Sequence, residues 1–300
     1  MIPQVSYSTA GFGGLELSPA LDQIAGAGFR CVELVCDRHA PSDHPSVVAQ
    51  EVRRQLEERG MTATTVHAPA RRTVLGAPTE DWRTEKIPVL ADALRMTGEI
   101  GAHGMVIHGI PNPIFLPEDC DLKSMYEAMV AAMRRSVEDL IPAAQEVGVR
   151  MLLENLPYNR DLRAAGKDGD YPLMRMADLR AFIEDFPPEQ VGLIVDVGHA
   201  WTDGMDPARE ILIAGDRLWG THLQDVDRDN PQDNHWAPLD GGLDWPSIVS
   251  ALQQIGYAGA YTFEVIAPRR GESADELARM TFAAARAWGL VNDEWPKHEC

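Results

Sequence analysis

The sequence predicts an α/β fold in which eight parallel strands close into a single (β/α)8 barrel. Short runs rich in valine and isoleucine recur along the 300 residues, and a longer segment of helical period follows them. The runs do not alternate strictly, which is typical of strands covered on both faces. Eight such units in one chain favour a closed barrel. An open doubly wound sheet is the alternative.

The strands are expected at the eight apolar runs. In chain order these are Gln4 to Tyr7, Cys31 to Val35, Ala63 to His67, Met105 to His108, Arg150 to Glu154, Gly192 to Asp196, Trp219 to His222 and Ala260 to Glu264. Each run is short and rich in residues that suit strands, and polar segments separate it from the next.

Helices are expected between the strands. The first is opened by Ser18 and Pro19, because serine caps a helix and proline suits its first turn. The others are Pro45 to Arg59, Glu80 to Glu99, Leu122 to Val147, Met176 to Phe186, Trp245 to Gln254 and Ala274 to Trp288. Glycines follow several of these segments, as expected where a helix ends through a left-handed residue.

The chain shows no Gly/Ser-rich linker or block of charge that would separate two halves. We therefore expect one domain over residues 1–300, with residues 293–300 as a candidate tail. Two connections, Ile110 to Asp121 and Leu156 to Pro172, are long and follow strand ends. Such loops lie over the mouth of a barrel and carry binding residues, although simple insertions are the alternative.

Composition excludes several classes of protein. Acidic side chains number 46 against 27 basic ones, and the net charge of −19 disfavours a nucleic-acid partner. The sequence contains no run of 18 apolar residues, so no membrane-spanning helix is predicted. The four cysteines (Cys31, Cys36, Cys120 and Cys300) form no CxxC pair, and no signal peptide is recognisable, so we expect a cytoplasmic protein without a disulfide framework.

Six successive predicted strands end in a side chain that can bind a metal: His67, His108, Glu154, Asp196, His222 and Glu264. The ends of barrel strands surround one mouth, so these groups can converge. Clustered carboxylates inside a barrel repel one another and lose their hydration. A bound cation offsets both costs. The set Glu154, Asp196, His222 and Glu264 therefore predicts a divalent metal, Mn, Co, Mg or Zn. No nucleotide-binding glycine motif is present, and no organic cofactor is expected.

Three further side chains follow these strands. His199 comes three residues after Asp196, and Asp233 and His235 are separated by one residue in a loop. Each of them has an alternative without a function in the site. His199 could cap the next helix, and Asp233 and His235 could belong to a solvated loop. His67 and His108 could likewise bond to backbone at the rim. His39, His44, His103 and His298 match no strand end, and structural roles are expected for them.

The segments LLEN, VDVGH, THLQD, PLDGGLDW and FEV, in that order, resemble the sugar phosphate isomerase/epimerase superfamily of xylose isomerase-like TIM barrels over nearly the whole chain. Ketose 3-epimerases and, more distantly, endonuclease IV are members. The resemblance implies that Glu154, Asp196, His222 and Glu264 hold one metal and that His199 and Arg228 contact substrate oxygens. The sequence Asp240-Gly241-Gly242 lacks the glutamate that the family often has there.

These observations predict a metal-dependent isomerase or epimerase of a small sugar, keto-sugar or polyol, phosphorylated or not, working through a metal-stabilised enediolate. Glu154 and Glu264 would exchange the proton, and His67 and His108 would contact substrate. The alternatives are a dehydratase with the same enolate chemistry, a barrel that binds sugar without turnover, and a zinc phosphoesterase similar to endonuclease IV. In the last of these His67, His108, His199, Asp233 and His235 are additional ligands. The number of chains stays open, with a homodimer as the candidate assembly.

Overall fold

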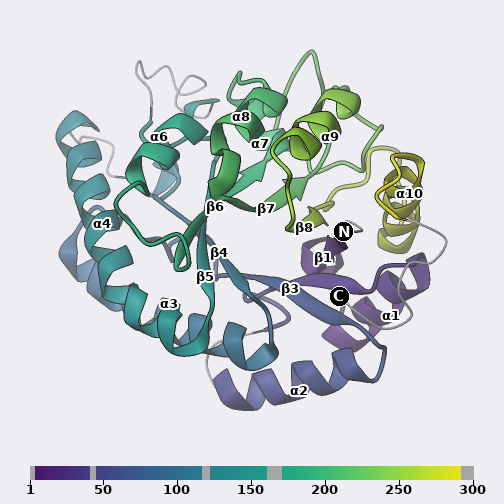
Figure 1. Ribbon diagram of the computed structural model, residues 1–300, viewed down its shortest axis with the longest axis horizontal. Helices are drawn as coiled ribbons and strands as arrows, with labels where there is room; N and C mark the ends of the chain where they lie inside the picture. The colour runs from purple at the N-terminus through teal and green to yellow at the C-terminus, as the bar shows by residue number, and fades with distance from the viewer. Residues whose placement is uncertain (1–3, 41–44, 117–121, 161–170, 292–300) are drawn as a thin grey trace.

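The computed structural model describes residues 4–40, 45–116, 122–160 and 171–291. Eight parallel strands follow one another around a closed barrel, and β1 pairs with β8 to complete it (Figure 1). The strands are β1 Gln4–Ser8, β2 Cys31–Val35, β3 Thr62–His67, β4 Gly104–His108, β5 Arg150–Glu154, β6 Val191–Asp196, β7 Leu218–Leu223 and β8 Ala260–Phe263. The predicted barrel and its eight strands are confirmed.

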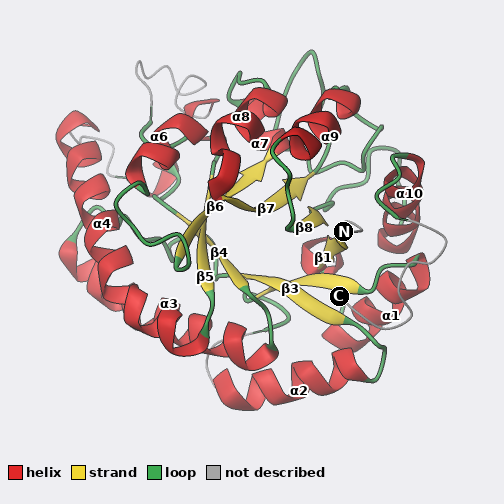
Figure 2. Cartoon of the chain, in the orientation of Figure 1, coloured by secondary structure: helices red, strands yellow, loops and turns green. Residues whose placement is uncertain are grey.

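Helices surround the strands on the outside of the barrel (Figure 2). They are α1 Leu17–Ala27, α2 Pro45–Glu57, α3 Glu80–Ile100, α4 Leu122–Val147, α6 Met176–Phe182, α7 Val197–Thr202, α8 Pro207–Ala214, α9 Trp245–Gln254 and α10 Ala274–Ala287. Short 3-10 helices span Thr9–Phe12, Pro113–Phe115 and Gly215–Arg217.

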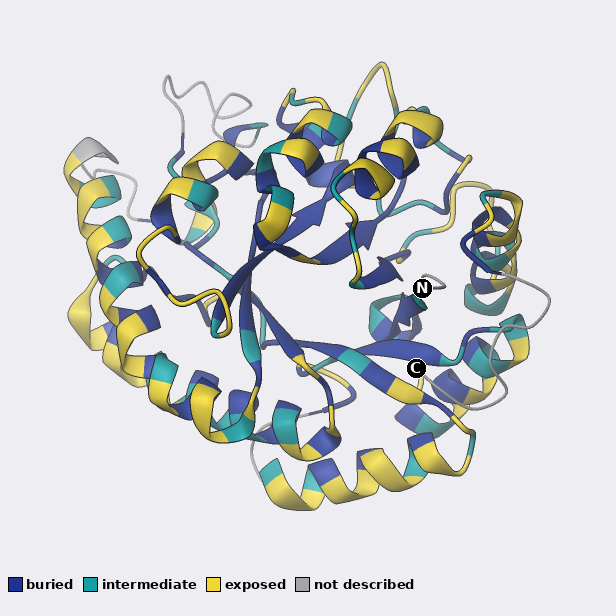
Figure 3. Ribbon diagram, in the orientation of Figure 1, coloured by how far each residue is buried: buried dark blue, intermediate teal, exposed yellow. Residues whose placement is uncertain are grey.

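Apart from the almost fully buried α7, the helices bury one face against the barrel and expose the other (Figure 3). In α1 the buried positions Leu17, Ala20, Leu21 and Ile24 recur at the spacing of three and four residues that places side chains on one helix face. The strands are buried almost throughout, because helices cover them outside and side chains fill the barrel inside.

Inside the barrel, Val106, Leu152 and Ile194 form a separate, fully buried apolar cluster. They lie on β4, β5 and β6, two residues before the last residue of each strand. Side chains two apart on a strand point the same way. This apolar layer therefore lies directly beneath the terminal side chains of the three strands and closes the barrel under its mouth.

Several helix boundaries differ from the prediction. Helix α1 begins at Leu17 with Glu16 as its N-cap residue, so Ser18 lies inside the helix. Helix α6 ends at Phe182 rather than Phe186. The short helices α7 and α8 between β6 and β7 were not predicted, since six and eight residues show too little periodicity to be recognised.

Within the described residues no helix combines the length and apolar character needed to cross a bilayer. Cys36 is buried with a free thiol, whereas Cys31 is disulfide-bonded, so the expectation of no disulfide is wrong for Cys31. Sequence spacing could not indicate this, because pairing depends on which segments folding brings together. Cys120, Cys300, His44, His298 and the candidate tail 293–300 lie outside the described residues.

Candidate metal centre

Four side chains from neighbouring strands converge at the carboxyl end of the barrel. Glu154 and Asp196 are the last residues of β5 and β6, His222 lies on β7 opposite Asp196, and Glu264 directly follows β8. One ligand atom from each of the four lies within 4.8 Å of every other, and all four residues are buried. Parallel strands of a closed barrel place these atoms together, although up to 110 residues separate them in sequence (264 − 154).

The imidazole of His222 lies among the three carboxylates. Its Nδ1 atom is 2.9 Å from Glu154 Oε1, 3.2 Å from Glu264 Oε2 and 4.0 Å from Asp196 Oδ2. Burial removes water that would otherwise screen the carboxylates from one another. One imidazole nitrogen and carboxylate oxygens are the donor set of manganese, cobalt or zinc sites, and the arrangement fits a divalent cation.

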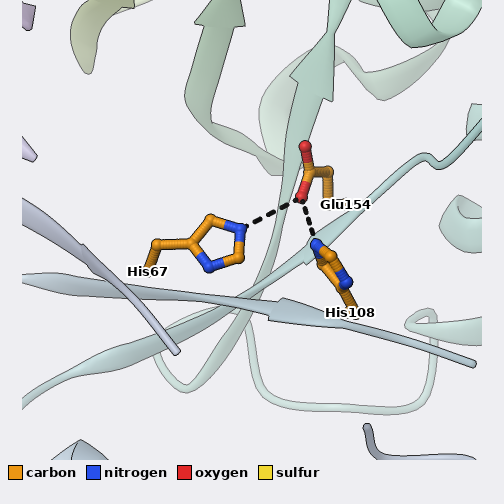
Figure 4. A group of neighbouring side chains, drawn as sticks. All are labelled: His67, His108 and Glu154. Carbon is orange, nitrogen blue, oxygen red and sulfur yellow. Dashed lines mark ion pairs between the residues drawn. The ribbon is translucent and has the colours of Figure 1, made fainter. Parts of the chain in front are cut away.

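A second cluster lies beside the first and shares Glu154 with it. Glu154 Oε2 is buried and makes no hydrogen bond, and it faces His108 Nε2 at 3.4 Å and His67 Nε2 at 3.7 Å (Figure 4). The three ligand atoms lie within 4.8 Å of one another. A buried carboxylate oxygen without a hydrogen bond, facing two imidazole nitrogens, is a suitable place for a second cation.

A third cluster contains Asp196, His199 and His235, again with ligand atoms within 4.8 Å of one another. Asp233 joins the two histidines: its Oδ1 atom is 3.1 Å from His199 Nε2 and 2.9 Å from His235 Nε2. The cap of α7 is Asp196, whose carboxylate accepts the His199 backbone N–H at 2.7 Å. The side chain of His199 is therefore available to the cluster rather than serving as a helix cap.

The carboxylates make the electrostatic potential of this region negative. Burial disfavours the charged ring of His67, but the Glu154 carboxylate outweighs it and raises its pKa to about 9. Burial acts in the same way on His235, where Asp233 and then Glu264 raise the pKa to about 9. The same potential attracts a metal cation.

A cavity of about 640 Å³ opens over the three clusters. His67, His108, Glu154, His199, Asp233, His235 and Glu264 line it. The described parts of the two long connections contribute Asn112, Ile114, Pro157 and Tyr158 to its wall, as expected for loops over the mouth. Asp196 and His222 are fully buried and are not among the lining residues.

One predicted residue lies apart from this cavity. Arg228 is exposed, and it is not among the residues that line the cavity. Its carbonyl oxygen accepts a hydrogen bond from Trp201 Nε1 at 3.3 Å. The substrate contact of Arg228 remains a prediction.

Sequence reasoning missed a buried acidic residue that contacts the centre. Glu33 lies in the middle of β2, is 0% exposed, and has both carboxylate oxygens within 3.1 Å of His222 Nε2. A charged residue inside the apolar run CVELV was the available signal, because glutamate is almost never fully buried without a partner.

Comparison with known proteins identifies the family. Residues 21–284 match the family described as xylose isomerase-like TIM barrel. An uncharacterized protein from Methanocaldococcus jannaschii is 24% identical over 252 residues, covering 83% of this chain and 79% of the relative. D-psicose 3-epimerase of Enterocloster bolteae is 22% identical over 257 residues, covering 86% of this chain and 79% of the relative.

Solved structures have the same fold. A D-tagatose 3-epimerase-like protein superposes with a TM-score of 0.76 at 17% identity, covering 95% of this chain and 96% of that chain. The 3-keto-D-glucoside 4-epimerase YcjR from E. coli has a TM-score of 0.74 at 19% identity, covering 95% of this chain and 99% of that chain. The family match spans most of the residues that form the barrel, and the chain belongs to the xylose isomerase-like TIM barrel family.

Proposed function

We propose that the protein is an enzyme, a metal-dependent epimerase or isomerase of a small sugar. The observation that carries the proposal is the buried set of three carboxylates around His222 Nδ1 at the floor of a cavity large enough for a sugar. The relatives named as psicose, tagatose and keto-glucoside epimerases support this class of substrate.

Glu154, Asp196, His222 and Glu264 would hold the metal. When bound, a divalent cation polarises the carbonyl oxygen of the sugar and makes the adjacent carbon more acidic. Their mixed oxygen and nitrogen donors suit manganese, cobalt, magnesium or zinc, and no organic cofactor is part of the proposal.

Glu154 and Glu264 are the proposed acid/base pair. Glu154 on β5 and Glu264 just after β8 both contact His222 Nδ1, and both line the cavity. One carboxylate accepts the proton from carbon, and the other, in its protonated form, returns a proton to the opposite face. His199 lines the cavity beside Asp233 and would orient substrate hydroxyls.

A single experiment tests this function. The purified protein is stripped with a chelator, reloaded with Mn²⁺, Co²⁺, Mg²⁺ or Zn²⁺, and incubated in D₂O with ketoses, keto-inositols and their phosphates. We expect metal-dependent entry of deuterium at a carbon next to the carbonyl, together with an isomer or epimer. Loss of water from the keto-inositol would instead assign a dehydratase. No exchange with any metal and any sugar would refute the proposal.

A multinuclear phosphoesterase is the second candidate, favoured by the two additional clusters around His67 and His199. Several clustered zinc ions generate hydroxide and stabilise a leaving oxygen. Metal analysis after reconstitution separates the candidates, since one ion per chain supports the epimerase and three zinc ions support the phosphoesterase. The net charge of −19 argues against a nucleic-acid substrate, and a nicking assay on abasic duplex DNA checks this directly.

A further inference from the structure

Glu33 is a carboxylate enclosed by the barrel. It is 0% exposed, lies on β2, and is absent from the residues that line the cavity. Its Oε2 atom accepts a hydrogen bond of 2.8 Å from the hydroxyl of Thr65, which is its register partner on β3. Its two oxygens lie 3.0 and 3.1 Å from His222 Nε2. Burial of a carboxylate destabilises the folded protein unless such partners stabilise the charge. A buried glutamate held by these contacts therefore indicates a specific role.

Three of the other four histidines in the clusters are oriented differently. In His67, His199 and His235 the Nδ1 atom contacts a backbone carbonyl oxygen, and Nε2 faces another side chain of the clusters. The carbonyls belong to Ala68 (2.8 Å), Asn155 (2.9 Å) and Glu264 (3.0 Å), respectively. A carbonyl accepts and never donates, so in each ring Nδ1 carries the hydrogen and Nε2 is left for the cluster.

His222 has the reverse orientation. Its Nδ1 atom faces Glu154 and Glu264, while Nε2 points away from the cavity to Glu33. We infer that Glu33 is a positioning residue, whose carboxylate accepts the Nε2–H bond of His222 and so directs the Nδ1 lone pair at the metal position. The inference rests on the proposed function, because it assumes a metal held by Nδ1.

Two features hold this arrangement in place. The ring of His67 stacks on that of His222 at a centroid distance of 5.9 Å and an angle of 11°. Thr65 restrains Glu33 from the neighbouring strand. A carboxylate behind a metal-bound imidazole fixes the ring and makes its other nitrogen a stronger ligand, which a neutral carbonyl does less well. His222 thereby differs from His67, His199 and His235 in ligand strength as well as in orientation.

The first test measures metal affinity rather than activity. The Kd for Mn²⁺ and Zn²⁺ is determined by chelator competition for wild type, Glu33→Ala and Glu33→Gln. We expect Glu33→Ala to weaken binding about 10- to 100-fold. Glu33→Gln should fall between Glu33→Ala and wild type, because its amide oxygen still accepts the hydrogen bond but carries no charge.

Glu210→Gln is the matched control. Glu210 is also a buried glutamate, 5% exposed, and it accepts a hydrogen bond from the Met176 backbone outside the cavity. Its variant should keep the wild-type Kd. Unchanged metal affinity in Glu33→Ala would overturn the inference while leaving the proposed function intact. A wild-type protein that binds no metal would refute the proposed function instead.

The second test needs no variant and so does not depend on whether Glu33→Ala folds. Wild-type protein labelled with ¹⁵N-histidine and loaded with Zn²⁺ should show one imidazole with a protonated Nε2 and a metal-bound Nδ1. A zinc-loaded protein in which every metal-bound imidazole carries its hydrogen on Nδ1 would overturn the inference.

Discussion

Glu264 presents a carboxylate to the cavity from the residue directly after β8. Replacing it by glutamine preserves its shape but removes the charge that accepts a proton. We expect Glu264→Gln to retain the fold and to lower kcat by at least about 100-fold, the usual contribution of a general acid or base. The measurement is turnover of the sugar found in the exchange experiment, with circular dichroism as a check of folding. Turnover near that of wild type would contradict the proposed role.

His39 is a buried histidine outside the clusters, and its Nε2 atom bonds to the Leu15 carbonyl oxygen at 3.0 Å. Burial lowers the pKa of His39 below 6.5, and the positive charge of Arg38 lowers it further. The bond to Leu15 and the negative charge of Glu16 partly offset this decrease. In the window between the lowered pKa and 6.5, the unfolded chain binds more protons than the folded protein. The stability from neutral His39 is therefore complete above pH 6.5 and is lost as the pH falls through its folded pKa.

Urea unfolding of wild type and His39→Gln checks this at about pH 7.5 and pH 5.5. Glutamine can still donate to the Leu15 carbonyl but does not titrate. We expect the free energy of unfolding to fall more on acidification in wild type than in the variant. An equal fall in both proteins would show that His39 is not responsible for any of the acid sensitivity.

The loop after β7 is organised by the buried carboxylate of Asp225. It accepts hydrogen bonds from the backbone of Val226 (2.9 Å), Leu239 (3.0 Å) and Gly242 (3.0 Å) and from Trp245 Nε1 (2.9 Å). The same residue forms a backbone bridge with Trp236, next to His235. Asp225 therefore fixes the loop that carries Asp233 and His235 to the third cluster.

Removal of this carboxylate leaves several buried donors without a partner. Each unsatisfied buried donor costs about 1–3 kcal/mol, so Asp225→Ala should lower the free energy of unfolding by at least about 3 kcal/mol. Asp244→Ala is the control, because Asp244 caps α9 at the surface and its loss should cost about 1 kcal/mol. Urea titration measures both, and equal losses would contradict this role of Asp225.

The same loop accounts for the departure from the family pattern at residues 240–242. A Cβ atom on Gly241 would collide with the carboxylate of Asp225 and the carbonyl oxygen of Val226. Asp240 is 4% exposed and pairs with Arg270 at 3.1 Å. The turn therefore packs tightly against the buried carboxylate, and glycine at position 241 is required by space.

At the scale of the whole molecule, the candidate centre joins β5, β6, β7 and β8, and repulsion between its carboxylates opposes folding without a cation. A ligand that binds only the folded protein stabilises it, by about 2.7 kcal/mol at a free concentration 100 times its Kd. We expect Mn²⁺ or Zn²⁺ to raise Tm and a chelator to reverse the change. Glu264→Gln should show a smaller rise. A Tm that does not respond to any of the proposed metals would contradict the metal centre.

Much of the architecture could be predicted because each strand is an apolar run between polar helices. β2 and β5 have the predicted bounds, and the other strands differ by one residue at one end or, in β7, at both ends. Helices α7 and α8 were missed because each is short, and α7 is too buried to show a polar face. The strand-end positions of Glu154 and Asp196 could be predicted from the same runs, whereas His222 lies one residue before the end of β7 and Glu264 one residue beyond β8.

The sequence by itself determined the barrel and the strand ends that carry the metal-binding side chains, because the side-chain pattern along each strand is local. Only the tertiary structure decided which nitrogen of each histidine faces the centre, that Glu33 lies behind His222, and that Arg228 lies away from the cavity. Those features depend on contacts between strands far apart in the chain. Glu33 and His222, for example, are 189 residues apart, and only closure of the barrel brings them together.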